Sequence, residues 1–520
     1  MKKAIKKLMA ALLVVAMVCA MAIPAFADTE SIREHHSFKA FQIFKGNVND
    51  ASEISNVEWG SCIHDYHDFL AKLKDDPTLR IPFQDADSLQ KVLDVMKDWT
   101  PSDDNSIAFA RFVCNYLYPT ADADPQPFIP TSGDVVQIPN DGAGYYLIVD
   151  TTDFSSGDDY HACNSFLLNV TQAPWNLPIT PKAENPSVKK EVFDNPDGTN
   201  EAGFGSSADH AINEEFQFKL TATLPASNDN DRAYDYYEKY TVTFHDTLSA
   251  GITFDRWDTV VINNGGDDIT IPGEKYIRDV SGQNLTLNID NVKTCASGLN
   301  LNNGATITVT YTAHLNDNAF VNTAGGTTTD NKNSVYLTYS NNPKNNTSLG
   351  KTPKSEVCVY TYQLNNTKYH DKAEAGYELE GAGFRLYSDK DYNNEIKLKK
   401  NEDGTYSRDF STDAKGVEMK SADDGTFNVK GLDAGTYYLK ETSTPAGYSA
   451  CDIPPVTIKA THTEERVYLD GSTLSTTIIN NKAGGITLPS TGGIGTTIFY
   501  VVGGGLMVAA IVLLVTKKRM

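Results

Sequence analysis

The chain has 520 residues, with 67 acidic and 45 basic side chains and a formal net charge of −22. The basic residues that cluster at its two ends leave the part between them more acidic still. Such a surface repels nucleic acid, so nucleic acid is excluded as a partner. It suits a soluble extracellular protein that repels its neighbours until something specific joins them.

The first residues predict a secretory signal peptide. Lysines within the first seven residues precede an apolar stretch from Leu8 to Ile23, and Ala25 and Ala27 are the small residues that signal peptidase requires. We therefore expect residues 1–27 to be removed and the exported chain to begin at Asp28. About 460 residues remain once both ends are set aside, which is enough for three domains.

Cysteine spacing in the exported part fits no CxxC or zinc pattern. An even number of cysteines outside the cell permits disulfides without requiring them. Cys358 and Cys451 are the pair expected to fall within one domain, which makes them a possible disulfide. The six cysteines are Cys62, Cys114, Cys163, Cys295, Cys358 and Cys451.

The first predicted domain, residues 28–180, has a mixed pattern. Alternating apolar positions predict strands at 38–44 and 144–150, and helical spacing appears at 64–73, 86–99 and 107–117. A β-sandwich with inserted helices is expected. His64 and His67 lie three residues apart, which is a possible metal-ligand spacing, but surface histidines on an amphipathic helix explain them more simply, so no metal and no cofactor is assigned.

From residue 187 onward β-rich runs alternate with Asn, Asp and Gly clusters, a cadence typical of immunoglobulin-like sandwiches. Proline-bearing joints at 179–186 and 342–353 place one domain at 181–352 and another at 353–485. The predicted strands are 216–220, 240–244, 306–311 and 335–339 in the middle domain, and 384–387, 427–429, 437–439, 456–458 and 476–479 in the last.

Strand parity in the last domain predicts three buried polar side chains. Glu441 shares a face with Tyr437 and Leu439, Lys368 shares parity with Tyr360, Tyr362 and Leu364, and Asn480 shares parity with Ile478. First and last strands are neighbours in such a sandwich, so Lys368, Glu441 and Asn480 are expected to meet. Asn481 stays open as an alternative to Asn480.

A lysine, a carboxyl group and an asparagine that meet in a core have a specific chemistry. Burial lowers the pKa of an amine and raises that of a carboxyl group, so both can be neutral at once. The neutral amine is a nucleophile, and the protonated carboxyl group can polarise the asparagine carbonyl and relay protons. The expected product is a Lys–Asn isopeptide bond, with loss of ammonia.

Two motifs carry a family resemblance. Residues 438–442 (YLKET), followed by 445–448 (PAGY), resemble the E-box of the collagen-adhesin B-type domain of Gram-positive pilins. Residues 244–248 (FHDTL), ahead of 251–254, together with 333–339 resemble the companion pilin domain, in which an aspartate replaces the glutamate. The resemblance implies a second set, made of Asp246, Asn333 and a lysine on the first strand. Lys190 is expected, because Val188, Lys190 and Val192 face one way, with Lys189 as the alternative.

The C-terminal segment, residues 486–520, resembles the cell-wall sorting signal of Gram-positive surface proteins. It has an apolar run from Ile494 to Thr516, long enough for a bilayer core of about 30 Å, and a basic tail that would remain in the cytoplasm. The resemblance implies that a sortase cuts between Thr491 and Gly492. The motif itself is Leu488, Pro489, Ser490, Thr491 and Gly492.

An acceptor lysine is expected before the middle domain, where backbone pilins carry a Tyr-Pro-Lys-Asn-like stretch. Residues 179–183 keep Pro181 and Lys182 but have Thr180 and Ala183 in place of the tyrosine and asparagine. Lys182 is therefore the predicted acceptor. Lys354, in a second Thr-Pro-Lys tripeptide, is a rival whose position does not match the family.

These features predict a mainly β protein with three tandem immunoglobulin-like, collagen-adhesin-type domains, the first with helical insertions, between a signal peptide and a transmembrane sorting helix. The resemblance implies the major subunit of a sortase-assembled pilus (fimbria), anchored in the cell wall and supporting adhesion. Its expected partners are copies of itself, pilin and housekeeping sortases, peptidoglycan, ancillary pilins and a surface receptor. The alternative is a monomeric wall-anchored adhesin or an ancillary pilus subunit.

An enzyme is disfavoured, because the sequence contains no nucleophile elbow, HExxH motif or phosphate-binding loop. The expected isopeptide chemistry is autocatalytic and intramolecular, and the resemblance implies that the chain is the substrate of a sortase.

Overall fold

The computed structural model describes residues 37–48, 54–100, 103–119, 123–132, 135–139, 141–151, 166–170, 175–178, 185–195, 202–225, 237–297, 299, 301, 305–323, 329–342, 347–462, 467–469 and 472–483. The segments predicted as signal peptide and sorting signal lie outside these residues. Within the described part, no helix is long and apolar enough to cross a membrane.

The chain divides into two units. The first contains Met1–Asn322, Gly326–Thr361 and Lys459–Asp470, and the second contains Thr323–Gly325, Tyr362–Ile458 and Gly471–Met520. The polypeptide therefore leaves the first unit, enters the second, and returns to the first for a short segment.

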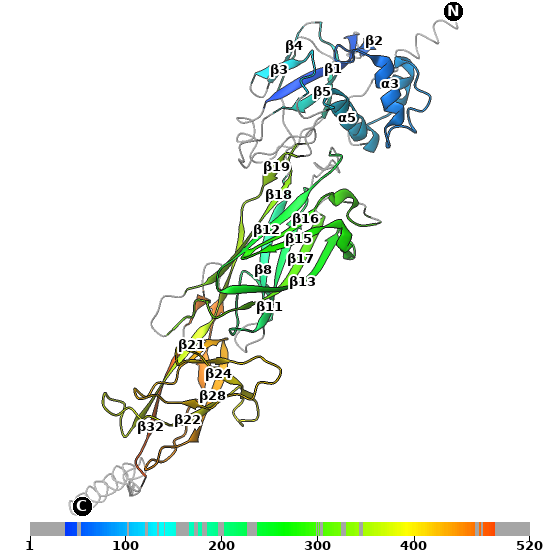
Figure 1. Cartoon of the computed structure of the whole chain (residues 1–520). Coiled ribbons are helices and arrows are strands. Elements are labelled where there is room, and N and C mark those ends of the chain that lie inside the picture. The colour runs from blue at the N-terminus through cyan, green and yellow to red at the C-terminus, as the bar shows by residue number, and fades with distance from the viewer. Residues whose placement is uncertain are drawn as a thin grey trace, which may run out of the picture. The chain divides into compact units, whose positions relative to one another are not determined.

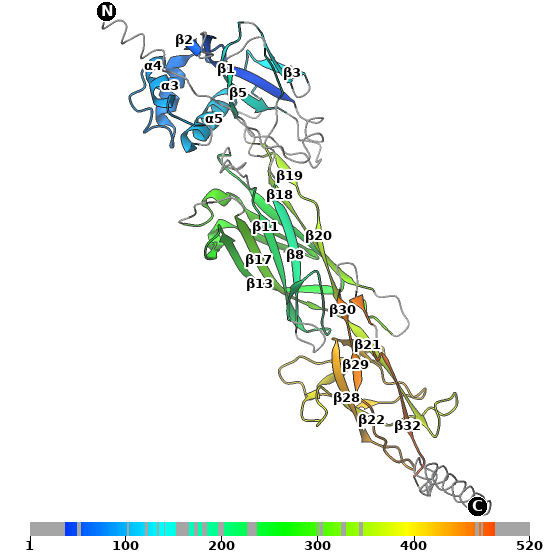
Figure 2. The same cartoon turned by 180° about the vertical axis from the view of Figure 1, so that it is seen from behind.

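The N-terminal part of the first unit is a seven-stranded sheet in the order β6-β5-β1-β3-β4-β7, with β2 paired to β1. Helices α3 and α5 lie beside β1 and β5 (Figures 1 and 2), and their apolar faces share one core with that sheet. The elements are β1 (Phe38–Val48), β2 (Ile54–Trp59), α3 (Tyr66–Asp75), α4 (Leu89–Met96), α5 (Asp104–Leu117), β3 (Ile129–Ser132), β4 (Val135–Ile138), β5 (Gly144–Asp150), β6 (Phe166–Val170) and β7 (Trp175–Pro178).

This arrangement confirms the mixed pattern read from the sequence. All three predicted helices are present, and they follow one another between β2 and β3. Their inward positions recur at helical spacing; Phe69, Leu70 and Leu73 of α3, for example, are buried.

The middle part of the first unit is a sandwich of two sheets. One has seven strands, in the order β10-β20-β18-β12-β16-β15 with β19 paired to β18, and the other has six, in the order β14-β13-β17-β11-β8-β9. Side chains from both sheets form a single apolar core. The strands are β8 (Ser187–Asp194), β9 (Gly203–Gly205), β10 (Ser207–Asp209), β11 (Glu215–Thr223), β12 (Val242–Leu248), β13 (Ile252–Asn263), β14 (Ile269–Thr270), β15 (Ile277–Ser281), β16 (Asn284–Ile289), β17 (Thr306–Leu315), β18 (Asn331–Ser340), β19 (Leu349–Lys351) and β20 (Ser355–Tyr360), with 3-10 turns at Gly273–Lys275 and Val292–Thr294.

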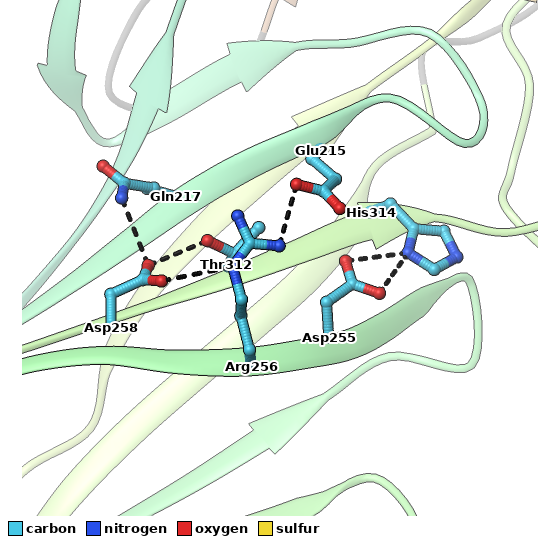
Figure 3. Close-up of polar contacts among 7 residues, drawn as sticks. All are labelled: Glu215, Gln217, Asp255, Arg256, Asp258, Thr312 and His314. Atoms are coloured by element: carbon cyan, nitrogen blue, oxygen red, sulfur yellow. Dashed lines mark hydrogen bonds and ion pairs between the residues drawn. The ribbon is translucent and has the colours of Figure 1, made fainter. Parts of the chain in front are cut away.

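The outer face of the six-stranded sheet carries a polar network across β11, β17 and β13, which Figure 3 shows from the solvent side. Asp258 accepts hydrogen bonds from Gln217 (3.1 Å) and Thr312 (2.8 Å). His314 Nδ1 lies 2.8 Å from Asp255 Oδ1, and both side chains are partly exposed. On β11 and β17 these residues alternate in sequence with core residues such as Phe216, Phe218, Tyr311 and Ala313, so the network lies on the opposite face of the sheet from the core.

The second unit is a sandwich of two five-stranded sheets, in the orders β24-β25-β27-β21-β32 and β23-β22-β28-β29, with β26 paired to β22. Its strands are β21 (Tyr362–His370), β22 (Gly383–Tyr387), β23 (Glu395–Ile396), β24 (Leu398–Lys400), β25 (Tyr406–Arg408), β26 (Met419–Lys420), β27 (Val429–Leu432), β28 (Gly435–Ser443), β29 (Val456–Ile458) and β32 (Ser475–Asn480). The hairpin of β30 (Thr461–His462) and β31 (Val467–Tyr468) belongs to the first unit.

Two sequence-based expectations differ from the structure. The boundary expected at 352/353 lies later, because β20 pairs with β18 and β10 of the middle sheet and the second unit continues from Tyr362. Cys358 and Cys451, expected as a possible disulfide, are both free thiols, and the Cys358 thiol donates to Asp330 at 3.2 Å.

Gly425 sets the position of β21. Its φ is +74°, and a Cβ atom there would lie 2.4 Å from the backbone oxygen of Lys368. The backbone amide of Lys368 donates to the Gly425 oxygen at 2.8 Å. A residue with a side chain would therefore displace the strand that carries this lysine.

The substitution Gly425→Ala should lower the thermal unfolding midpoint of the second unit, because it adds a backbone clash to the strain of a positive φ. Gly404→Ala is the matched control, since its φ is +83° and nothing lies within 4 Å of its Cβ position. The control should lose about 1–2 kcal/mol from the positive φ alone. Equal losses in calorimetry would show that Gly425 does not constrain β21.

Candidate functional site

Lys368 lies wholly inside the second unit, with 0% of its surface exposed. It follows Tyr362, Leu364 and Asn366 on the inward face of β21, as its parity predicted. Its Nζ atom contacts Asn480 Oδ1 and lies 3.5 Å from Glu441 Oε2. Asn480 Nδ2 in turn donates to Glu441 Oε1 at 2.7 Å. The three predicted side chains therefore form one contact group.

The strand arrangement explains this meeting. The first and last strands of the unit, β21 and β32, pair in parallel with Lys368 opposite Ile478 and His370 opposite Asn480. Glu441 reaches the group from β28 in the other sheet, and its side chain is 1% exposed. Asn481, the alternative to Asn480, is exposed to solvent, so the geometry favours Asn480.

Apolar surroundings make this lysine unusual. Phe384 and Phe427 stack with ring centroids 4.1 Å apart, and Lys368 Nζ lies 5.6 Å from the Phe384 centroid. Desolvation lowers the pKa of Lys368, against the opposing pull of Cys451 and Glu441. The amine is therefore easier to deprotonate than in water.

Lys190 occupies the equivalent place in the middle sandwich. It is 2% exposed, whereas the Lys189 side chain is 71% exposed and bonds to Glu191. The geometry therefore selects Lys190, as parity predicted. Its Nζ atom contacts Asp246 Oδ2 and donates to the Tyr311 hydroxyl at 3.1 Å.

Asn333 completes the set through Tyr311. Its Nδ2 atom donates to the Tyr311 hydroxyl at 2.6 Å, and the same hydroxyl donates to Asp246 Oδ2 at 3.2 Å. Lys190 and Tyr311 come from the six-stranded sheet, and Asp246 and Asn333 from the seven-stranded sheet. The amine and the amide thus share one hydroxyl between the two sheets. In the part of the chain that the structure describes, Lys190 and Asn333 make no direct hydrogen bond to each other.

Burial dominates the ionisation of the set. Desolvation lowers the pKa of Lys190 to about 8, although Asp246 opposes the shift. It also raises the pKa of Asp246, against the effect of Lys190, and places that of Tyr311 well above its usual range. The arrangement therefore combines an amine whose pKa is lowered with a carboxyl group and a hydroxyl whose pKa values are raised.

Tyr311 and Cys451 contact the buried lysines but were not predicted from the sequence as members of the two sets. Tyr311 had a signal, because it shares inward parity with Ile307 and Val309, and a buried tyrosine hydroxyl normally needs a partner. Cys451, considered only for a disulfide, has its sulfur 3.7 Å from Lys368 Nζ. No sequence spacing links Cys451 to that lysine.

The remaining predicted residues are placed as follows. Lys354 is exposed at the surface. Lys182 and the motif 488–492 lie outside the described residues. His64 and His67 flank the start of α3, where Asp65 accepts hydrogen bonds from the backbone amides of His67 and Asp68, and His64 Nε2 lies 2.6 Å from the Gln126 oxygen.

Comparisons with known proteins agree with parts of this picture. Residues 365–473 match the SpaA family of prealbumin-like fold domains, and residues 480–520 match the LPXTG cell wall anchor motif. No curated protein matches the chain.

Solved structures similar to the chain include three pilins. A three-domain backbone pilin of Streptococcus pyogenes is 17% identical, with 87% of this chain and 97% of that chain covered and a TM-score of 0.48. The full-length major pilin SpaD of Corynebacterium diphtheriae is 21% identical, with coverages of 66% and 80% and a TM-score of 0.40. The major pilin BcpA of Bacillus cereus is 15% identical, with coverages of 66% and 86% and a TM-score of 0.36.

The two matched segments follow each other in the C-terminal third of the chain. Residues 365–473 contain most of the described part of the second unit, and residues 480–520 contain the LPXTG motif. The chain is thus a cell-wall-anchored surface protein that carries a SpaA-type prealbumin-like domain next to its anchor.

Proposed function

We propose that this chain is the major structural subunit of a covalent, sortase-polymerised pilus. The observation that carries the proposal is the pair of buried lysine–carboxyl–asparagine sets, one in each of two sandwiches of a wall-anchored chain. Buried lysines are costly in a core unless they are neutralised or paired. Their recurrence with the same partners favours a chemical role over a role in packing.

Each set is arranged for isopeptide formation. The neutral lysine amine attacks the asparagine side-chain carbonyl, so that a new C–N bond forms and the bond to the amide nitrogen breaks. The carboxyl group, Glu441 or Asp246, polarises the carbonyl and passes the lysine proton to the departing ammonia. In the middle domain the Tyr311 hydroxyl, which contacts all three groups, is the proposed route for that proton.

The bonds would suit a fibre under tension. Lys368 is on the first strand of its sandwich and Asn480 on the last, and the two strands are adjacent. A pulling force that enters at Lys368 would pass directly to Asn480 through the cross-link. The residues between them would then bear little of the load, and the cross-link would also restrict the unfolded chain.

The proposed polymerisation joins Thr491 of one copy of the chain to Lys182 of another. A pilin sortase would cleave after Thr491, hold the subunit as a thioester and transfer it to the Lys182 amine of another copy. A housekeeping sortase would finally join the fibre to peptidoglycan. Ancillary pilins and a surface receptor complete the proposed set of partners.

The internal bonds predict a mass deficit. Two bonds expel two molecules of ammonia, so the reduced mature chain should be about 34 Da lighter than its sequence mass.

Glu441→Ala should abolish the Lys368–Asn480 branched peptide and leave the Lys190–Asn333 peptide, because Asp246 serves the latter independently. Tandem mass spectrometry of tryptic peptides distinguishes the two. A surviving Lys368 branch in Glu441→Ala would remove Glu441 as the catalytic acid.

A chain unable to form the middle bond should show a particular pH dependence. In Asn333→Ala the folded-state pKa of Lys190, about 8, lies below its unfolded value near 10.4. Between these values the unfolded state binds more protons, so the free energy of unfolding should rise with pH, by at most about 3 kcal/mol. Below about pH 8 both states bind the proton and this contribution is flat.

The matched control is the double variant Asn333→Ala/Lys190→Met, which keeps a side chain of similar length without the amine. Calorimetry of both variants between about pH 7 and pH 10.5 isolates the lysine. The difference between them should shrink as the pH rises. A constant difference would mean that the Lys190 pKa is not lowered by burial.

Polymerisation itself is tested by two lysine variants in a Gram-positive host that supplies the cognate sortase. Lys182→Arg keeps the charge but is a poor nucleophile, so it should be exported and anchored as a monomer. Lys354→Arg changes the same Thr-Pro-Lys tripeptide at an exposed position and should still give a high-molecular-weight ladder on immunoblots of wall extracts. Loss of the ladder in Lys354→Arg alone would move the acceptor to Lys354, and ladders in both variants would place the acceptor on another lysine. Absence of a ladder even in the wild type would favour the monomeric adhesin or ancillary subunit.

A further inference from the structure

Three side chains far apart in the sequence meet where the β30–β31 hairpin contacts the middle sandwich. Asp194 ends β8, Asp209 ends β10, and His462 belongs to β30, which is orange in Figure 2. One possible ligand atom from each lies within 4.8 Å of the other two. All three residues belong to the first unit.

The group is sheltered from solvent. The side chains of Asp209, Asp194 and His462 are 0%, 10% and 14% exposed. Two carboxylates enclosed in this way repel each other, and a cation between them relieves that repulsion. The hairpin thus brings a nitrogen ligand to a pair of oxygen ligands at a buried position.

The distances fit a shared ion better than a direct hydrogen bond. His462 Nε2 lies 3.5 Å from Asp209 Oδ2 and 4.0 Å from Asp194 Oδ2, whereas N–H···O hydrogen bonds are about 2.7–3.2 Å long. Zinc bonds of about 2.0–2.1 Å in a tetrahedron place neighbouring ligand atoms about 3.3–3.4 Å apart. Small movements of the side chains would bring all three atoms to that spacing.

A second contact orients the imidazole ring. Ser207 Oγ lies 3.0 Å from His462 Nδ1, and Ser207 shares a strand face with Asp209 on β10. When Nδ1 donates its proton to Ser207, Nε2 presents a lone pair toward the two carboxylates. A cation between this lone pair and the carboxylate oxygens would bind both, and a hydrogen bond to the far ring nitrogen is the usual support of a metal-bound histidine.

We propose that Asp194, Asp209 and His462 bind a divalent transition metal of the zinc class, with a water molecule in the fourth position. Mixed imidazole and carboxylate ligands suit such a metal better than calcium, which takes six to eight oxygen ligands. The ion would fasten the β30–β31 hairpin to the middle sandwich. No sequence motif marks this site, because its ligands come from three strands that are far apart in the chain.

The test uses the mature chain, residues 28–491, after treatment with a chelator. Titration calorimetry with Zn²⁺ should show one tight equivalent per chain, and Co²⁺ should give the visible absorption of a tetrahedral site. His462→Gln and Asp209→Asn should each weaken Zn²⁺ binding at least tenfold, and Ser207→Ala should weaken it roughly 10–100-fold. Asp209→Asn keeps the shape of the side chain, so it still tests the site if His462→Gln displaces the hairpin.

His314→Gln is the matched control, because His314 also pairs with a carboxylate, Asp255, but on the exposed face shown in Figure 3. It should bind Zn²⁺ as the wild type does. Failure of the wild type to bind a stoichiometric ion would overturn the proposal and leave a protonated His462 paired with the two carboxylates. Unchanged binding in both His462→Gln and Asp209→Asn would overturn it equally, by placing the zinc elsewhere on the chain.

Discussion

The burial of two lysine amines inside β-sandwiches is the constraint on which the rest of the structure depends. An ammonium group without water is tolerated only if it is neutralised or paired. Each lysine therefore meets a carboxyl group from the opposite sheet, an asparagine from a late strand and the faces of aromatic rings. A register slip of one residue in β8 or β21 would turn the lysine toward the surface and break its contacts with the carboxyl group and the asparagine.

Strand parity explains how much of this could be predicted. In β8 and most of β21 buried side chains alternate with more exposed ones. The choice of Lys190 over Lys189 follows from Val188 and Val192, two residues away on the same face, and the inward position of Lys368 follows from Tyr362 and Leu364 on its face of β21. The helices of the N-terminal part could also be predicted from the sequence, because their apolar positions recur with helical spacing. Local periodicity is a sufficient signal for features of this kind.

Features that depend on distant strands could not be predicted. β20 follows a proline-bearing joint and was expected to open the last domain, yet its hydrogen-bond partners are β18 and β10. The same misplacement made Cys358 and Cys451 look like a pair. Tyr311 joined its set because β17 faces β12 and β18 across the sandwich, and strand parity along β17 alone says nothing about that meeting.

The β30–β31 hairpin has a consequence for the order in which the protein matures. Its residues, Lys459–Asp470, belong to the first unit although they follow the long Tyr362–Ile458 segment of the second unit in the chain. A polypeptide exported from its N-terminus cannot complete the first unit until these late residues have crossed the membrane. The finished first unit would thus report that translocation has almost reached the anchor. A chain truncated before residue 459 would lack that segment and leave the first unit incomplete.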